Sequence, residues 1–300
     1  MTKSDNTSRE KEIYKVTLCG GAVNLLLLVF KFVAGVAAHS SAMIADAVHS
    51  LSDFVTDIVV IAFVRISGKP QDEDHEYGHG KYETFATALI GAALLIVGIG
   101  IFADSASGIV GFMRGERLEA PGMLAFVAAL VSVLSKEAVY RYTVIKGRRL
   151  NSKAVIANAW HHRSDALSSV GTMAGIGGAI FLGDTWRVLD PLAALVVSLF
   201  IIRVAWQLVK PSIDELLEKS LPKEMEDTIT AVILSFKGVR SPHHLRTRYI
   251  GNTIAIEVHI RLDGSMTLSE AHDITKRIEA ALKEKFGERT HIGIHMEPWK

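Results

Sequence analysis

Six long apolar segments constrain this 300-residue chain more than any other feature of its sequence. A helix needs about 20 apolar residues to cross the hydrocarbon core of a bilayer, and each segment reaches that length. Short polar links separate the segments, which run over residues 13–38, 42–66, 85–112, 123–145, 154–182 and 189–209. We therefore expect six transmembrane helices.

The composition changes near residue 210. The chain is 49% hydrophobic, and most of the apolar residues lie before that point, whereas the remainder is charged and mixed. This shift predicts a six-helix transmembrane transport domain over residues 13–211 and a cytoplasmic domain over residues 212–300. Residues 1–12 are polar and no cleavage site follows the first apolar segment, so we expect a cytoplasmic N-terminal tail and no removable signal peptide.

Basic residues predict the orientation. The links expected on one side of the membrane carry most of the Lys and Arg, while the other side holds only Arg114, Arg117 and Arg187. Cytoplasmic links are enriched in Lys and Arg, so both termini should be cytoplasmic. The single cysteine, Cys19, excludes an intrachain disulfide and a Cys-based zinc site. A net charge of +1 gives no bias toward nucleic acid, and no nucleotide-binding Walker A motif is present.

A polar motif occurs twice inside the apolar segments. The stretches Ile44–Asp53 (IADAVHSLSD) and Ile156–Asp165 (IANAWHHRSD) align without gaps, and each holds His and Asp four residues apart. This spacing places both side chains on one helix face, near the middle of the membrane, where ionisable groups are costly and mark functional sites. Two imidazoles and two carboxylates suit a tetrahedral site for Zn²⁺ or a similar ion. The candidate ligands are His49, Asp53, His161 and Asp165.

One such pair alone would be explained equally well by hydrogen bonds between helices. Two matching pairs at one depth favour a metal site. Asp46 and Asn158, three residues before the histidines, are interpreted as contacts between helices or as groups that support the ligands.

The C-terminal part predicts a small α+β domain. An apolar helix face starts near Met225, a strand is expected over 245–250, and a second strand over 253–262 alternates apolar and polar residues. A capping box at Thr267 predicts a helix to about residue 286, followed by a last strand over 290–295. The order α-β-β-α-β fits a ferredoxin-like domain.

Two further groups of metal-binding residue types lie outside the apolar segments. The link after the second segment reads PQDEDHEYGHGK, which a solvated acidic loop would also explain. The C-terminal domain holds several His residues and Glu297, and His295 and Glu297 share a strand face because they are two residues apart. Which of these side chains meet is left open by the sequence.

Taken together, these features resemble the cation diffusion facilitator family. The resemblance covers nearly the whole chain. It rests on the two His/Asp motifs, on HEYGHGKYE after the second segment, on LDPLAALVVS in the sixth, and on HHLRTR, VHI, AHDITKRIE and IHMEP in the C-terminal domain. It implies a homodimeric secondary transporter of the cytoplasmic (inner) membrane that exports divalent cations in exchange for protons.

The resemblance also implies residue roles. The transport site maps to His49, Asp53, His161 and Asp165. The loop site maps to Asp72, His75 and His79. The cytoplasmic metal site maps to His243, His259, His272, His295 and Glu297, and a charged interlock that holds the dimer maps to Lys81 and Glu218. The two His/Asp pairs resemble the zinc-selective pattern, with Cd²⁺ as an alternative substrate, and put manganese or iron in doubt.

Two other classes of protein compete with this hypothesis. A membrane metalloenzyme would need an open coordination position on zinc and a nearby general base, and four protein ligands argue against it. A metal sensor would not need paired ligands in the middle of the membrane. Because metal binding requires neutral imidazole and ionised carboxylate, metal and protons would compete for the transport site. The sequence therefore favours an antiporter with Zn²⁺ as substrate and protons as counter-ions.

Overall fold

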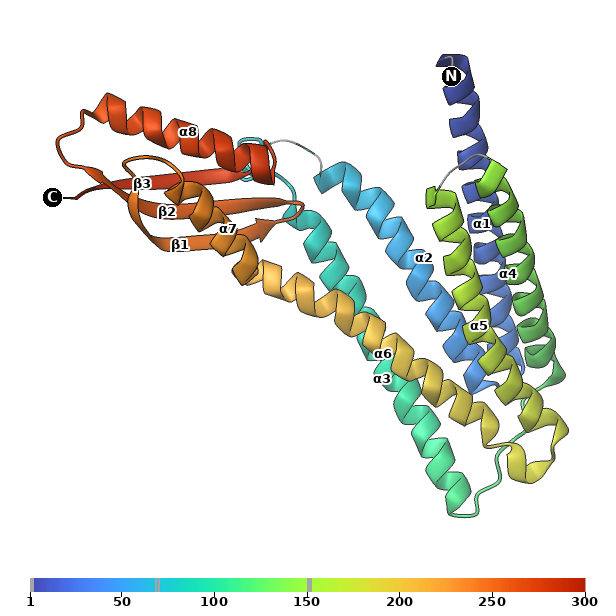
Figure 1. The fold of residues 1–300 in the computed structure, drawn as a ribbon. Helices are drawn as coiled ribbons and strands as arrows, with labels where there is room; N and C mark the ends of the chain where they lie inside the picture. The colour runs from blue at the N-terminus through green and yellow to red at the C-terminus, as the bar shows by residue number, and fades with distance from the viewer. Residues whose placement is uncertain (1–2, 68, 70, 150–152, 300) are drawn as a thin grey trace. The chain divides into compact units, whose positions relative to one another are not determined.

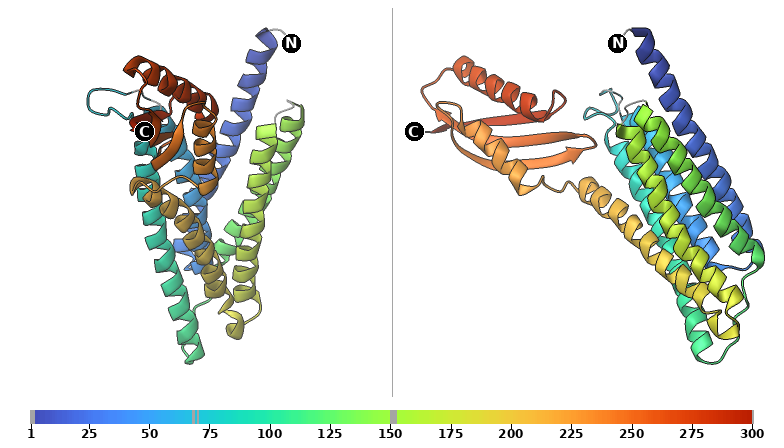
Figure 2. Two further views of the ribbon diagram at one scale, coloured as in Figure 1. Left: turned by 60° about the vertical axis from the view of Figure 1, so that its left-hand side comes forward. Right: turned by 45° about the vertical axis from the view of Figure 1, so that its right-hand side comes forward.

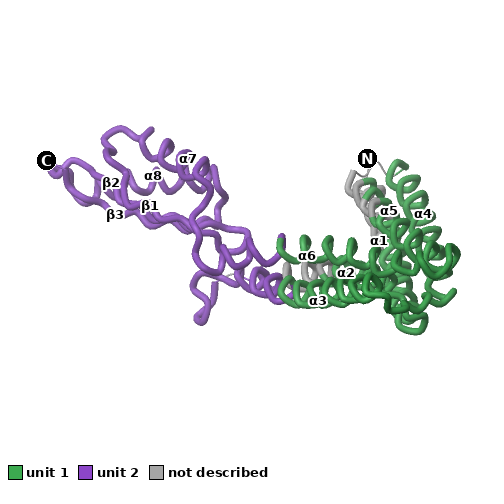
Figure 3. The backbone as a smooth tube through the Cα atoms, turned by 90° about the horizontal axis from the view of Figure 1, so that it is seen from below, with its two compact units in different colours: residues 1–57, 91–206 green, residues 58–90, 207–300 purple. Residues whose placement is uncertain are grey.

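The computed structural model describes the backbone of residues 3–67, 69, 71–149 and 153–299. Within it, the side chains that are described exclude those of residues 3–14, 17, 56–65, 153–155, 157–158, 161–162 and 164. Two compact units make up the chain (Figure 3). The first contains residues 1–57 and 91–206, and the second contains residues 58–90 and 207–300.

Six long helices precede a small sheet domain (Figure 1). They are α1 (Lys3–Ala37), α2 (Ser41–Ser67), α3 (Lys81–Met113), α4 (Met123–Arg149), α5 (Lys153–Phe181) and α6 (Leu189–Leu216), with a short 3₁₀ turn, η1 (Asp184–Trp186), before α6. Each expected apolar segment coincides with one helix. α1 also includes most of the polar residues before position 13.

Four stretches of the described residues are long and apolar enough to cross a membrane by length and composition. They are Leu18–Ala37, Lys81–Met113, Met123–Arg149 and Asp184–Leu216. α2 and α5, which carry the two His/Asp motifs, are not among them, so six membrane crossings stay a prediction. The described residues therefore support a transmembrane domain with four candidate crossings.

Small residues allow the helices of the first unit to pack closely. Its buried core is rich in alanine, from Ala34 in α1 to Ala194 in α6. Gly175 of α5 shows why: a Cβ there would lie 2.5 Å from the Cβ of Ala193, closer than two carbon atoms can approach. Apolar side chains gain nothing by leaving lipid for a helix interface, so close packing of small residues is what holds such helices together.

Asp190 of α6 fastens the start of α2. Its carboxylate accepts hydrogen bonds from the Ser40 hydroxyl (2.6 Å) and from the backbone N–H groups of Ser41 (2.8 Å) and Ala42 (3.4 Å). These N–H groups have no partner within the helix, and the N-terminal end of a helix dipole favours a negative charge. The carboxylate therefore fixes the N-terminal end of α2, eight residues before His49.

The second unit contains the sheet domain, in the predicted order. It consists of α7 (Lys223–Leu234), β1 (Arg240–Ile250), β2 (Thr253–Asp263), α8 (Leu268–Phe286) and β3 (His291–Trp299). The sheet order is β1-β2-β3, with β1 antiparallel and β3 parallel to β2. α8 makes the crossover that a parallel pair requires, and it begins with the expected capping box between Thr267 and Glu270.

One face of this sheet is covered and the other carries polar residues. The helices α7 and α8 lie beside the sheet (Figure 2). The alternating Ile and Val residues of β2 form a core with buried residues of these helices, including Ile229 and Ile278. Side chains alternate between the two faces of a strand, so His259 of β2 lies on the face opposite this core. The covered face provides the hydrophobic core of the domain, and the opposite face is available for ligand binding.

Candidate metal centres

Three clusters of His and carboxylate side chains appear among the described residues, and each corresponds to one site expected from the sequence. In each, ligand atoms from three residues lie within 4.8 Å of one another. The clusters are His49, Asp53 and Asp165; Asp72, His75 and His79; and His243, His259 and Glu297.

The first cluster joins α2 to α5. His49 and Asp53 lie one helical turn apart on α2, and Asp165, with 8% exposure, approaches them from α5. The Nδ1 atom of His49 is buried and has no hydrogen-bond partner among the described residues, as expected for a lone pair that is available to a metal. The fourth candidate, His161, belongs to α5, but its side chain lies outside the described residues.

Two buried lysines accompany this cluster. Lys31 of α1 is fully buried, and its Nζ lies 2.6 Å from Oδ2 of Asp46 and within hydrogen-bond distance of Ser50 and Ser169. Ser169 of α5 also donates to Asp46 at 3.1 Å. Asp46 is therefore a contact between helices, as one interpretation of the sequence held, and it ties α1, α2 and α5 together beside the site.

Lys136 of α4 is a residue that the sequence reasoning missed. Its side chain is 4% exposed, and the charges that it faces are those of Lys31, Asp46, Asp53 and Asp165. An ionisable residue inside an apolar helix is itself a signal of function, and the fourth segment carries Lys136 near its centre. The candidate transport site is thus surrounded by fixed charges of both signs.

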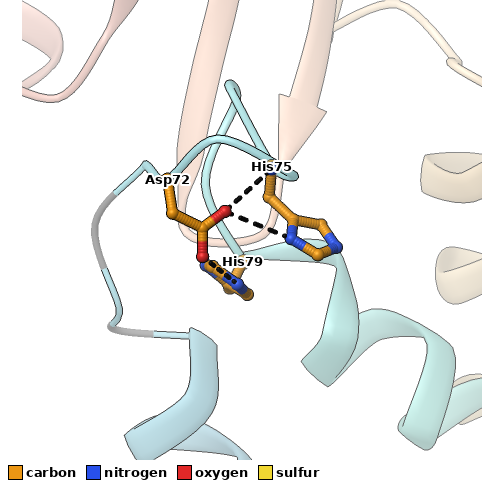
Figure 4. A group of neighbouring side chains, drawn as sticks. All are labelled: Asp72, His75 and His79. Carbon is orange, nitrogen blue, oxygen red and sulfur yellow. Dashed lines mark hydrogen bonds and ion pairs between the residues drawn. The ribbon is translucent and has the colours of Figure 1, made fainter.

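The second cluster lies in the link between α2 and α3 (Figure 4). The carboxylate of Asp72 sits between two imidazoles, 3.4 Å from Nδ1 of His75 and 3.3 Å from Nε2 of His79. The backbone N–H of His75 donates to Asp72 at 2.8 Å, and the hydroxyl of Tyr82 lies 3.0 Å from Nε2 of His75. The remaining acidic residues of the link lie outside this cluster.

The pKa of Asp72 is shifted by opposing causes. Desolvation is the largest single cause and would raise the pKa of its carboxyl group. The hydrogen bonds from His75 and the charges of the two nearby imidazoles together outweigh it and lower the pKa. The net direction is below the ordinary value of 3.8, so the carboxylate is ionised at neutral pH and suited to bind a cation.

The third cluster is built by strand register. His243 of β1 is directly opposite His259 of β2, which is directly opposite His295 of β3. Glu297 follows His295 by two residues and reaches the same face, with Oε1 3.1 Å from Nδ1 of His259 and Oε2 3.3 Å from Nε2 of His243. We call these four residues the histidine row.

A bulge in β1 brings an additional histidine to the row. The register shifts on both sides of His243, and Ser241 and His244 have positive φ angles of 47° and 50°. As a result, both His243 and His244 place their rings within 5.4 Å of the ring of His259. Bulges, and non-glycine residues in the left-handed backbone conformation, are often found where side chains are directed at functional sites. No local pattern in the sequence indicated the bulge in β1.

The electrostatics of the row favour a cation. The hydrogen bond from His259, together with Arg261 and His243, lowers the pKa of Glu297 below its ordinary value, although desolvation acts in the opposite direction. His272, which the resemblance includes in this site, is exposed on α8 and lies outside the cluster. The structure therefore brings together four of the five residues implied for the cytoplasmic site, and adds His244.

The implied interlock residues also meet. Lys81, at the start of α3, forms an ion pair with Glu218, which follows α6 and has a positive φ of 59°. Glu218 also pairs with Arg248 of β1 at 2.9 Å. These contacts are made within one chain, and a role in holding a dimer stays a prediction.

Comparison with known proteins decides the family. The model of the cation efflux transmembrane domain matches residues 18–217, and the model of the cation efflux protein cytoplasmic domain matches residues 221–299. The chain belongs to the cation diffusion facilitator family. Members of this family are transporters, so this cation diffusion facilitator exports divalent metal cations and is not an enzyme. It is an integral protein of the inner membrane, and its sheet domain is the family's cytoplasmic domain.

Proteins similar to this facilitator are named either for one metal or for metals in general. The manganese efflux system protein MneP of Bacillus subtilis is 35% identical over 98% of both chains. Metal tolerance protein C1 of Arabidopsis thaliana is 36% identical over 95% of this chain and 62% of its own length. A solved structure of the metal-bound C-terminal domain of the CzcD transporter from Thermotoga maritima is 33% identical over 26% of this chain and 94% of that chain, with a TM-score of 0.24.

Proposed function

We propose that this facilitator exports Zn²⁺ from the cytoplasm in exchange for protons, at a site formed by His49, Asp53, His161 and Asp165. The observation that carries the proposal is the convergence of His49, Asp53 and Asp165 from two helices within 4.8 Å. We further propose that α2 and α5 cross the membrane, which makes six crossings and places this cluster at mid-membrane.

The donor set supports zinc over manganese. Imidazole suits Zn²⁺, whereas Mn²⁺ prefers carboxylate, carbonyl and water oxygens. A site with two imidazoles and two carboxylates neutralises the ion and can be tetrahedral, which is the geometry of four-coordinate zinc. Manganese is the second candidate because MneP, named for manganese efflux, is similar over the full length of the chain. Cadmium, which accepts similar ligands, is an alternative substrate.

Competition between metal and protons supports the antiport. Metal can bind only when the imidazoles are neutral and the carboxylates ionised, so binding releases protons and protonation releases metal. In the cycle that we propose, the site loads from the cytoplasm, the helices rock, and protons from outside displace the metal. We also propose that the protein works as a homodimer in which cytoplasmic zinc on the histidine row favours the transporting form.

Flux into proteoliposomes tests this function. The purified protein is reconstituted with a zinc indicator and a pH indicator inside, and Zn²⁺, Cd²⁺ or Mn²⁺ is added outside. We expect zinc entry coupled to proton exit, with zinc faster than manganese. Faster manganese entry would overturn the selectivity, and metal flux without proton movement would overturn the antiport.

The variant His49→Asp sharpens the test of selectivity. Replacing an imidazole with a carboxylate makes the donor set harder, so the ratio of zinc rate to manganese rate should fall by about tenfold. Asp104→Asn, which alters an exposed residue of α3 outside the clusters, is the control and should leave the ratio unchanged.

A further inference from the structure

A cavity of about 460 Å³ lies within the second unit, beside the loop cluster, whose His79 is one of its lining residues. The cavity is separate from the cluster between α2 and α5 and from the cluster on the sheet. The link between α2 and α3 forms one wall, with Lys69, Tyr77 and Gly80. The sheet domain forms the other, with Lys283, Arg289 and His291. Its volume is sufficient for a small ligand.

Two glycines bring these walls together. A Cβ at Gly80 would lie 2.6 Å from the carbonyl oxygen of Ile250, and a Cβ at Gly251 would lie 2.7 Å from the Cα of Gly80. The two backbones are therefore in direct contact, which no other residue type allows. Glu215 adds to this junction by accepting hydrogen bonds from the Gly251 N–H (2.7 Å) and the Thr84 hydroxyl (2.8 Å). The cavity is thus bounded by a fixed junction.

The charges of the lining favour an anion. Lys69, Lys283 and Arg289 are cationic, and Glu288 is the one carboxylate among the lining residues that the structure describes. Lys283 also pairs with Glu279 outside the cavity at 2.5 Å. Burial lowers the pKa of His291, and the positive charges of Arg248 and Lys283 lower it further.

One of the lining residues has a buried hydroxyl without a partner among the described residues. Thr290 lines the cavity and is only 4% exposed, and its Oγ1 has no hydrogen-bond partner among the described residues. A buried hydroxyl without a partner is costly, so its presence points to a ligand that accepts its hydrogen bond. Cationic side chains with a hydroxyl donor form a common arrangement around phosphate oxygens.

We propose that this cavity binds an anionic phosphate group. Two sources share that chemistry: the headgroup of an anionic lipid, and a small soluble phosphate compound. The cavity is lined by Tyr77, Gly78, His79 and Gly80, which directly precede Lys81, the first residue of a candidate membrane span. A lipid headgroup at the cytoplasmic surface could therefore reach it. A bound phosphate would connect the segment between α2 and α3 to the sheet domain.

Calorimetry on the purified full-length protein tests this site. Short-chain phosphatidylglycerol, short-chain phosphatidylcholine and inorganic phosphate are titrated separately, in detergent with EDTA so that no metal can bridge the probe. We expect phosphatidylglycerol or inorganic phosphate to bind, and Lys283→Gln with Arg289→Gln to weaken binding at least about tenfold. Thr290→Val should weaken it several-fold, and Thr290→Ser should retain it.

The double variant Lys276→Gln with Lys285→Gln is the matched control. It removes the same charge from α8 at exposed positions outside the cavity and should bind as the unmodified protein does. Binding of phosphatidylglycerol alone identifies a lipid site, and binding of inorganic phosphate identifies a soluble ligand. The proposal is overturned if neither phosphatidylglycerol nor inorganic phosphate binds. It is also overturned if the control variant weakens binding as much as Lys283→Gln with Arg289→Gln does. The readout uses neither metal nor flux, so this result and the test of zinc export are independent.

Discussion

The cluster between α2 and α5 and the histidine row use the same residue types in opposite settings. The first is enclosed by helices, with Asp165 8% exposed and ammonium groups nearby. The second lies on the open face of a sheet, where His243, His259 and Glu297 are half-buried and His295 is exposed. A site that must exchange metal for protons across a membrane needs to exclude water, whereas a site that responds to cytoplasmic metal needs access. The difference suggests that one cluster moves metal and the other responds to it.

The largest effect expected from this comparison is on transport. Asp165→Asn removes a carboxylate that neutralises the cation within the helices, so zinc flux should fall to the rate of protein-free liposomes. Asp104→Asn makes the same change in α3 outside the cluster and should retain flux. Flux is measured with the zinc indicator described above. If Asp165→Asn transports at more than about half the normal rate, the helical cluster is not the transport site.

The next effect is on stability, and it tests whether the enclosed cluster depends on its buried ion pair. Lys31→Met leaves the Asp46 carboxylate buried without its partner, which should destabilise the protein by about 3 kcal/mol or more. Thermal unfolding in detergent measures this change. Adding Asp46→Leu removes the stranded charge and should restore most of the loss. If the double variant is as unstable as the single variant, the stranded Asp46 charge is not the cause of the lost stability.

A smaller effect is expected from the open site. His259→Ala removes the central ring of the row, so metal should stabilise the protein less, while flux at saturating zinc should fall by less than about tenfold. His272→Ala is the comparison, because this residue lies outside the cluster. Metal-dependent shifts of the melting temperature are measured for both. Equal losses in the two variants would mean that the row is completed by a residue from elsewhere, such as a second copy of the chain.

The smallest effect concerns the bulge. His244→Asn keeps a residue that tolerates a positive φ but removes the additional ring, so the protein should fold normally and bind metal at the row only a few-fold more weakly. The affinity is measured by zinc titration with a competing chelator. His244→Ala places a less tolerant residue at the same angle and separates ligand loss from backbone strain.

The difference between the two sites also explains which of them could be predicted from the sequence. His49 and Asp53 are four residues apart on one helix, so local periodicity alone places them together, and the repeated motif indicated the second helix. The order of elements in the sheet domain also followed from periodicity and from the capping box at Thr267.

Local patterns in the sequence could not show that the residues of the histidine row lie together. His243, His259 and His295 meet only through the register of three strands, and that register depends on pairing between residues far apart in the chain. The bulge that adds His244 depends on backbone angles that several residue types can adopt. His272 entered the site by resemblance and not by any pattern in the chain. Lys136 had a local signal, a charge within an apolar segment, but its neighbours come from other helices.

Lys136 also bears on how the charge of the site changes during a cycle. With imidazoles neutral and lysines protonated, the described residues Lys31, Lys136, Asp46, Asp53 and Asp165 carry one net negative charge. A divalent cation changes this to one net positive charge. The free-energy cost of placing charge in a medium of low dielectric grows with the square of that charge. The metal-free and metal-loaded forms, with net charges of equal size, therefore have the same cost. Without Lys136 the metal-free form would carry two negative charges, so the protons that return in exchange for the metal would have to offset a larger charge.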